Sequence, residues 1–203
     1  KPSVSTEKIY HLLSLDKGDF QQTYPIARQV FADESILQML SSSDLSQNSV
    51  YKIISNSQLP TPNSQLIQVS ITEISTYMQN VLLRDTDQMS MSSALEVRTP
   101  FLDYELVAYV LGIEDKFKYP HSPKKLLVDS LGDLLPNEIV HRKKMGFVLP
   151  WEYWMKNELK MFCEKNIHEL SERENFNSQY LKSLWNRFLK GDKRVTWAKL
   201  WIL

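Results

Sequence analysis

The sequence predicts a mainly α-helical fold. Apolar residues recur at three- and four-residue spacing through most of the 203 residues, which is the period of one face of a helix. Polar capping residues or proline precede several of these stretches, and glycines follow some of them, as helix starts and stops require. We find no convincing strand pattern and no internal repeat, so we expect helices almost throughout.

The first part of the chain is expected to hold helices over residues 7–16 and 22–40. Asp33 is placed to cap a second helix inside the latter range. Residues 41–65 are rich in Ser, Asn, Gln and Pro, which favours a loop or connection. A short helix at 50–54 is expected within it.

A longer helix is predicted for residues 66–83, where isoleucine, methionine and leucine fall on one stripe. It continues or restarts through Leu95, and Thr99-Pro100 then ends it, because the residue before proline is pushed out of the α region. Asp103 is the expected N-cap of the next helix, and Gly112 is its expected stop.

Two further helices are predicted before the tail. Ser122 and Pro123 give the start signal of the first, which would place Lys124 in its opening turn, and Gly132 ends it. A shorter helix is expected over 138–142. The tail holds all five tryptophans, whose helical spacing favours a structural core over a ligand site: Trp151, Trp154, Trp185, Trp197 and Trp201.

Composition excludes several classes of protein. Lysine plus arginine equals aspartate plus glutamate, 24 each, so a large surface for nucleic acid or anionic membrane is not expected. Cys163 is the only cysteine, which excludes an intramolecular disulfide and a thiolate metal cluster, and its context favours an inert thiol. No apolar run approaches the roughly 20 residues that span a bilayer, and the first residues, KPSVSTEK, show no secretory h-region, so a cytoplasmic protein is expected.

Four ionisable residues stand out in an otherwise apolar or small stretch: Arg84, Asp87, Glu96 and Arg98. One interpretation is a buried ion-pair network that fixes a helix junction. The other is the polar wall of a pocket for an anionic substrate, with the arginines facing phosphate or carboxylate.

Two basic segments are the other candidates. Lys124 and Lys125 lie where a helix start favours an anion, so they are either solvated lysines or part of a phosphate site. The loop of residues 141–151, which contains Lys144, is either a basic surface turn or a segment that closes over a polyanion.

The order of these segments resembles the synthetase domain of glutamine-hydrolysing asparagine synthetases. The strings RDTDQMSM and LEVRTPFLD are followed by Lys124-Lys125-Leu-Leu, a Leu-Pro turn, and Lys144-Met-Gly-Phe. The similarity is strong over residues 77–155. Val128 stands where the family usually has a basic residue, and Lys143 stands where proline is common.

The resemblance implies a role for each segment. Lys124 matches a family lysine at the adenylate and pyrophosphate end of the active site, where it would stabilise negative charge and assist proton transfer. Arg84, Asp87, Glu96 and Arg98 match positions that shape the site, and Lys125 and Lys144 accompany them on the phosphate side. No metal ligand is assigned in this chain.

The family's other parts are absent from these residues, including the cysteine nucleophile for glutamine hydrolysis and the Gly-rich pyrophosphate loop on a parallel sheet. The resemblance therefore implies that residues 1–203 are the helical C-terminal half of an α/β ATP-pyrophosphatase-type synthetase domain without its sheet. The parent would use ATP and Mg²⁺, and its missing sheet and glutaminase domain would be the partners of this part. We expect the isolated chain to bind neither cofactor and to be inactive.

The reaction implied for the parent is asparagine formation from aspartate and glutamine-derived ammonia through an acyl-adenylate. Amidation of another carboxylate, such as a uronic acid or a secondary-metabolite precursor, is the alternative within the family. A helical interaction module without chemistry is the alternative outside it.

Overall fold

The computed structural model describes residues 4–41, 45, 49–56, 64–118, 124–146 and 148–203. In these residues the fold is helical, and β pairing is limited to one antiparallel bridge between Leu40 and Phe176. The prediction of a mainly α-helical chain is therefore confirmed. Of the described helices, none is long and apolar enough to cross a membrane.

The chain forms two compact units. Unit 1 combines both ends of the chain, residues 1–48 and 147–203, and unit 2 is residues 49–146 between them. That residues 1–203 are part of one larger domain stays a prediction. Unit 1 contains α1 (Val4–Leu13), α2 (Phe20–Arg28), α3 (Asp33–Met39), α11 (Trp151–Lys156), α12 (Lys160–Ser171), α13 (Ser178–Leu189) and α14 (Trp197–Trp201).

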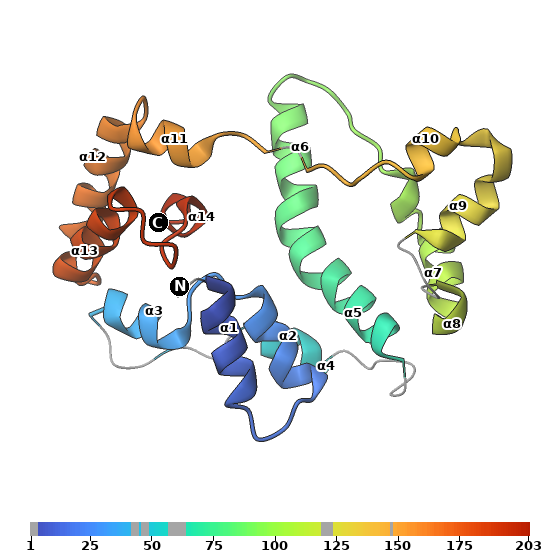
Figure 1. The fold of residues 1–203 in the computed structure, drawn as a ribbon, viewed down its shortest axis with the longest axis horizontal. Helices are drawn as coiled ribbons and strands as arrows, with labels where there is room; N and C mark the ends of the chain where they lie inside the picture. Colours follow the sequence, from blue (N-terminus) through green and yellow to red (C-terminus); the bar gives the residue numbers. More distant parts are fainter. Residues whose placement is uncertain (1–3, 42–44, 46–48, 57–63, 119–123, 147) are drawn as a thin grey trace. The chain divides into compact units, whose positions relative to one another are not determined.

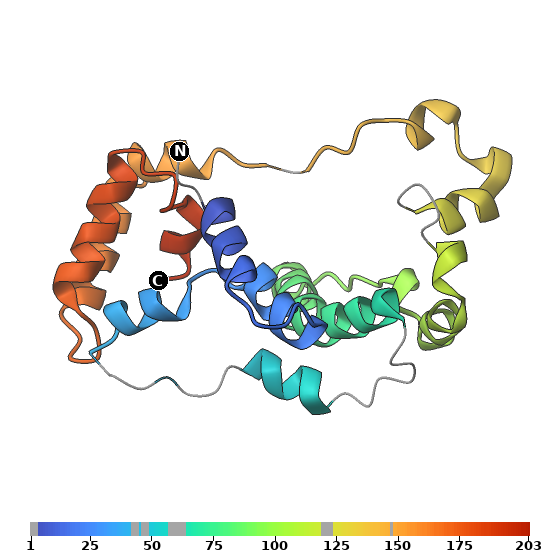
Figure 2. The same cartoon turned by 60° about the horizontal axis from the view of Figure 1, so that its bottom comes forward.

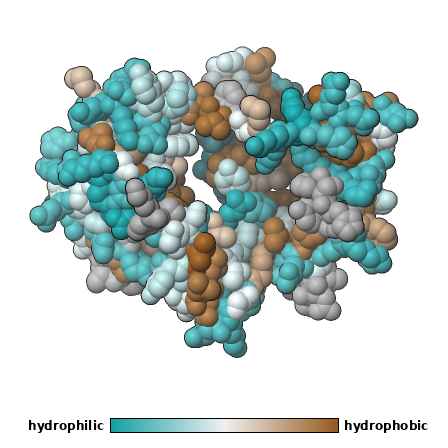
Figure 3. All heavy atoms as spheres, in the orientation of Figure 1, coloured by the Kyte–Doolittle hydropathy of each residue, from teal (hydrophilic) through white to brown (hydrophobic). Residues whose placement is uncertain are grey.

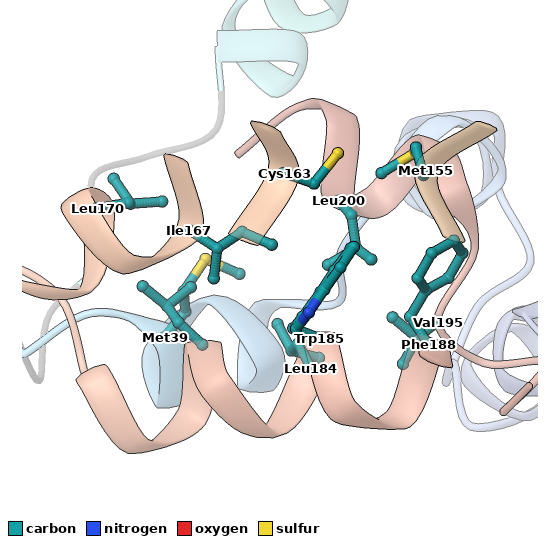
Figure 4. Close-up of a cluster of buried hydrophobic side chains, with 11 residues drawn as sticks. Met39, Met155, Cys163, Ile167, Leu170, Leu184, Trp185, Phe188, Val195 and Leu200 are labelled. Atoms are coloured by element: carbon teal, nitrogen blue, oxygen red, sulfur yellow. The ribbon is translucent and has the colours of Figure 1, made fainter. Parts of the chain in front are cut away.

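The core of unit 1 lies between α12 and α13, which pack along their length. Figure 4 shows side chains of these two helices facing one another, with Met39 reaching in from α3 and Leu200 from α14. Phe188 and Leu181 are 2% and 1% exposed. Burying each such side chain stabilises the fold by about 1.5–3 kcal/mol. The core explains why both ends of the chain join in one unit.

Backbone hydrogen bonds fix α3 to the turn before α13. The Asn177 N–H donates to the Met39 carbonyl at 2.7 Å, and the Ser41 N–H donates to the Asn175 carbonyl at 2.9 Å. The Asn177 side chain also caps α13, because its Oδ1 accepts from the Tyr180 N–H at 3.0 Å. One residue thus both starts a core helix and attaches the N-terminal segment to it.

Helix α13 ends in a Schellman motif centred on Gly191. The Gly191 N–H donates to the Phe188 carbonyl at 2.9 Å, and the Asp192 N–H donates to the Arg187 carbonyl at 3.0 Å. Gly191 has φ +76°, which glycine adopts at no steric cost. The motif places the Asp192 carboxylate beside the Arg187 side chain.

The tryptophans only partly follow the core prediction. Trp185 is 6% exposed and its indole N–H donates to Glu164 at 3.2 Å, as expected for a core residue. Trp201 is 46% exposed, and with Trp197 it packs around Trp151 at centroid distances of 4.6 and 5.9 Å. This second group of rings lies at the edge of unit 1, so the prediction of an inward-facing core is wrong for Trp201.

Cys163 is buried in the core of unit 1. Burial, with a smaller contribution from the Glu164 carboxylate, raises the pKa of its thiol. The thiolate is the reactive form, so burial and a raised pKa both favour the inert thiol that the sequence predicts.

Unit 2 is built on a continuous helical rod of three segments (Figure 1). The elements of unit 2 are α4 (Ser49–Asn56), α5 (Gln65–Glu73), the π-helix η1 (Ile74–Leu83), α6 (Arg84–Met91), the 3₁₀-helix η2 (Pro100–Leu102), α7 (Tyr104–Gly112), α8 (Asp115–Lys118), α9 (Lys125–Leu131), the 3₁₀-helix η3 (Gly132–Leu134) and α10 (Asn137–Val140). The rod consists of α5, η1 and α6. Figure 2 shows it from another side, with α7, α8 and α9 grouped beyond its α5 end.

The rod begins at a capped end and widens in its middle. Ser64 caps α5, since its Oγ accepts from the Ile67 N–H at 3.1 Å. The middle segment is a π-helix of 10 residues, a rare geometry that occurs often at functional sites. The Asn80 side-chain amide donates to the Thr76 carbonyl at 2.8 Å inside it. Helix α6 follows directly, and its end at Met91 is earlier than the predicted end at Leu95.

The helix after Pro100 matches its prediction. Asp103 Oδ1 accepts from the backbone N–H groups of Glu105 and Leu106, at 3.0 and 3.2 Å, and α7 ends at Gly112. Elsewhere a boundary differs: Ala32, without a side-chain cap, precedes α3, so Asp33 is its first residue and not its cap. An aspartate in the first turn still interacts favourably with the helix dipole.

Candidate functional site

The first candidate residues lie on α6, at the end of the rod in unit 2. Arg84 is the first residue of α6 and Asp87 is one turn further, and both side chains are exposed. Although their spacing permits an ion pair, none joins them in the described residues. Both charges are therefore available to groups outside this chain.

A turn after α6 changes the direction of the chain. Ala94 has φ +55°, and the Leu95 N–H donates back to the Ser90 carbonyl at 3.0 Å. The chain then runs without helix to η2, and Glu96 and Arg98 lie in this stretch. The turn places them in an extended segment beyond the end of the rod.

Arg98 and Glu96 form an ion pair. Arg98 Nε and Nη2 both lie 3.0 Å from Glu96 Oε1, and the two side chains are 84% and 71% exposed. In the described structure the alternative of a buried ion-pair network is wrong for this pair. An exposed pair adds little to stability, about 0–1 kcal/mol, so stability alone does not explain it.

Lys124 lies outside the helix that the sequence predicts for it. It is the residue before α9, with φ +62° and ψ +16°, and its side chain is exposed. The expected placement in the first turn is wrong, because α9 begins at Lys125. Ser122 and Pro123, the predicted start signal, lie outside the described residues. A non-glycine residue in the left-handed region is strained, and such strain is found often at functional sites.

Lys125 and Lys144 differ in their surroundings. Lys125 Nζ lies 2.5 Å from Asp129 Oδ2, one turn along α9, so its charge is already paired. Lys144 is exposed in the non-helical segment after α10, and residue 147 of the same loop lies outside the described residues. Of the three candidate lysines, Lys124 and Lys144 are therefore the ones without a partner carboxylate in the described residues.

The structure brings together one pair of the predicted residues, Glu96 and Arg98. Helix α6 continues η1, whereas α9 packs against α8 and η3. Among the described residues, no hydrogen bond or ion pair joins Lys124 to the segment from Arg84 to Arg98. That these cations converge on one polyanion stays a prediction.

A protein metal site needs several His, Cys, Asp or Glu side chains close together. In the described parts of the chain, no group of three or more His, Cys, Asp or Glu side chains could hold a metal ion. The described residues therefore offer no ready-made cluster of metal ligands.

Several large apolar side chains are exposed on unit 2. Figure 3 shows apolar surface, in brown, between the hydrophilic residues. Each of the following is more than 60% exposed: Met89, Leu95, Phe101, Tyr104, Tyr109 and Leu134. Exposed apolar residues in such numbers are typical of a surface that another segment or protein covers.

Sequence reasoning missed a second charged group, on unit 1. Asp192 accepts hydrogen bonds from Arg187 and Arg194, and Lys199 is 8% exposed near Glu7. The signal was the string RFLKGDKR, in which a glycine after a helix brings the next aspartate back to the preceding arginine.

The chain matches the asparagine synthase family over residues 8–203. The chain belongs to the asparagine synthase family. The predicted family resemblance is thereby confirmed, and it extends beyond residues 77–155. No solved structure matches the chain.

Relatives of this asparagine synthase family chain include two proteins of Bacillus subtilis (strain 168). One is named asparagine synthetase (glutamine-hydrolyzing) 1 and is 28% identical over 139 residues, which cover 68% of this chain and 22% of that protein. The other is named asparagine synthetase (glutamine-hydrolyzing) 3 and is 44% identical over 72 residues, 35% of this chain and 12% of that protein.

A protein of Acanthamoeba polyphaga mimivirus, named probable asparagine synthetase (glutamine-hydrolyzing), is 34% identical over 65 residues. These cover 30% of this chain and 12% of that protein. The chain thus spans no more than 22% of the length of these three relatives.

Proposed function

We propose that this chain is the helical C-terminal part of the synthetase domain of an ATP-dependent amidotransferase that makes asparagine. Membership of the asparagine synthase family over residues 8–203 is the observation that carries the proposal. The parent then has the α/β ATP-pyrophosphatase-type fold, and its sheet and glutaminase domain lie in segments other than these residues. Its cytoplasmic location stays a prediction from the sequence.

The proposed reaction has two stages. The side-chain carboxylate of aspartate attacks the α-phosphorus of ATP, which forms an acyl-adenylate and releases pyrophosphate. Ammonia from glutamine hydrolysis then attacks the acyl carbon, the amide bond forms, a proton is lost and AMP leaves. Mg²⁺ would supply charge neutralisation at the phosphates, with ligands from outside the described residues.

This chain's own residues would bind and orient the anionic groups. Lys124, exposed and held in the left-handed conformation, would face the negative charge that develops when the carboxylate attacks. Arg84 and Arg98 would contact carboxylate or phosphate oxygens, with Glu96 holding the Arg98 guanidinium in one orientation. Lys144 would approach from the basic loop.

The exposed apolar surface of unit 2 supports the proposal of a missing partner segment. Met89, Leu95 and Phe101 lie on or after α6, next to the charged candidates. A parallel sheet packed against this surface would bury them and bring a phosphate-binding loop to the same region.

The experiment compares the 203-residue chain with the full-length parent. Each is assayed with ATP, Mg²⁺, aspartate and ammonium, and asparagine and pyrophosphate are measured. We expect equal amounts of both products from the parent and neither from the chain alone. Asparagine formation by the chain alone would refute the proposal that it is an incomplete part.

A substrate screen on the parent tests the acceptor. Pyrophosphate release that needs aspartate supports asparagine synthesis. Release that is independent of aspartate, and appears with a uronic acid or another carboxylate, would assign the parent to the alternative amidation. No pyrophosphate release with any carboxylate would favour a helical interaction module.

A further inference from the structure

Unit 1 contains a cavity of about 190 Å³ that none of the candidate catalytic residues touches. Its wall includes Glu7 of α1, Arg187 of α13, Arg194, and Lys199 of α14, with Phe31 and Leu184 as apolar parts. The cavity has room for a small molecule, and its wall carries both acidic and basic side chains.

Arg187 is held so that its outer nitrogens stay available. Its Nε–H donates to Asp192 Oδ2 at 2.9 Å, and Asp192 is positioned by the Schellman motif. In the described residues, no hydrogen bond uses the two terminal nitrogens of Arg187. A guanidinium fixed through Nε presents these two nitrogens as a fork, which matches a carboxylate or a phosphate.

Arg194 is neutralised by the same carboxylate. Its Nε and Nη2 lie 3.1 and 2.9 Å from Asp192 Oδ1 and Oδ2, and its backbone N–H donates to Oδ1 at 3.0 Å. One carboxylate therefore serves two arginines, and positive charge remains in excess at this end of the cavity.

Lys199 adds a third cation. Its Nζ lies 3.7 Å from Glu7 Oε2 and 5.5 Å from the centre of the Phe31 ring, and the residue is 8% exposed. Burial lowers the pKa of Lys199, and Arg187 lowers it further, against the opposing effect of Glu7. Three cations share two carboxylates here, so an added anion would be stabilised.

We propose that this cavity binds a small oxyanion, whose carboxylate or phosphate group is held by the terminal nitrogens of Arg187 and faced by Lys199. Tyr180 offers a hydroxyl on the same wall, and Phe31 and Leu184 would contact the apolar part of the ligand. The site goes beyond the proposed synthetase function, because it is built wholly from unit 1 and shares no residue with the candidates on unit 2.

The first test is a titration of the unaltered 203-residue chain. Potassium phosphate and sodium succinate are added separately at constant ionic strength, with chloride as the reference anion. The ¹H–¹⁵N NMR signals of the arginine Nε–H groups are followed. We expect the Arg187 signal to move with saturation while the signal of Arg173, which is exposed on unit 1 and outside the cavity, does not.

Phosphate and succinate distinguish the two kinds of oxyanion. Saturation with either supports the site and names the preferred group. If neither anion saturates the Arg187 signal, or if all arginine signals move together and in proportion to concentration, the proposal is overturned.

Two variants show whether the anion binds in this cavity or is attracted only by the overall positive charge of the loop. Arg187→Gln removes the fork and should weaken binding about tenfold or more, as expected for hydrogen bonds to a charged group. Lys193→Gln removes one positive charge from an exposed residue of the same loop, outside the cavity, and should leave affinity within about twofold. Equal loss in both variants would overturn the proposal.

Circular dichroism of each variant checks that the helices are kept. Arg187→Lys serves as a second variant, since it keeps the charge and loses the planar fork. We expect it to bind the anion more weakly than the unaltered chain, and full affinity would count against the proposal.

Discussion

Arg98 Nε and Nη2 both lie 3.0 Å from Glu96 Oε1, in an exposed stretch that belongs to no helix. A carboxylate two residues away thus sets the orientation of a guanidinium that faces solvent. Because exposed pairs contribute little to folding, the substitution of Arg98 separates a functional role from a structural one.

We predict that Arg98→Ala changes the free energy of unfolding of the isolated chain by less than about 0.5 kcal/mol, because the pair is exposed. In the parent enzyme the same change should lower kcat/KM about tenfold or more, because it removes the guanidinium that is proposed to contact an anionic group of the substrate. Chemical denaturation and a pyrophosphate assay measure the two effects.

Glu114 and Lys116 provide the matched control for this prediction. They form an exposed pair at the same two-residue spacing, with Lys116 Nζ 2.6 Å from Glu114 Oε2. Lys116→Ala should leave both stability and activity nearly unchanged. An equal loss of activity in the two variants would contradict the proposal that Arg98 contacts the substrate.

Lys124 combines strain with an exposed amine, so its replacement by glycine has opposite effects on stability and activity. Lys124→Gly should stabilise the isolated chain by about 0.5–1 kcal/mol, because glycine adopts φ +62° without strain. The parent should lose most of its activity through the missing ammonium. Thermal unfolding and the pyrophosphate assay are the measurements.

Lys124→Ala tests the two effects separately. It removes the amine and keeps a Cβ in the left-handed region, so activity should fall without a gain in stability. If both variants retain full activity, Lys124 has no part in the reaction.

Phe188 tests the core of unit 1. Phe188→Ala should reduce the free energy of unfolding by about 3–5 kcal/mol, because a side chain that is 2% exposed leaves a cavity. Phe162, which is 56% exposed on α12, is the matched control, and Phe162→Ala should cost less than about 1 kcal/mol. Similar losses in urea denaturation would show that unit 1 does not pack as described.

Asp192 makes the stability of unit 1 depend on pH. Hydrogen bonds from the Arg194 side chain and backbone, with a smaller contribution from Arg187, hold the pKa of the Asp192 carboxyl well below its usual range. A carboxyl whose pKa is lowered by folding stabilises the protein above its unfolded pKa, about 3.9, and this contribution is lost as pH falls through the folded pKa.

We therefore expect Asp192→Asn to lower Tm at pH 7 and pH 5, and the difference from the unaltered chain to shrink as the pH falls below about 4. Thermal melts at these values measure it. Asp133→Asn, an exposed carboxyl on unit 2, should show no such pattern. A constant difference in Tm down to pH 2 would contradict the role of the ionised carboxylate.

Local signals predicted much of the helical structure. Asp103 and Gly112 bound α7 as their capping preferences indicate, because a cap depends on hydrogen bonds within a few residues. Lys124 shows where such signals fail. The left-handed conformation that separates it from α9 cannot be read from a lysine in a sequence, since a strained φ depends on surrounding structure.

The sequence singled out the candidate residues, but it did not predict how their side chains are arranged or how exposed they are. The Arg98–Glu96 pair lies in the segment that the sequence singled out, but its exposure depends on what covers it. The Arg187, Arg194 and Lys199 group was missed, because it joins two helices and the turn between them around a buried lysine.

Unit 1 is assembled from two stretches of chain that are separated by residues 49–146. During synthesis on a ribosome, α3 emerges long before α12 and α13, so Met39 has no core to enter until those two helices have been translated. The helices α1, α2 and α3 would remain a candidate for chaperone binding throughout that interval, and emergence of α12 and α13 would be the event that completes unit 1.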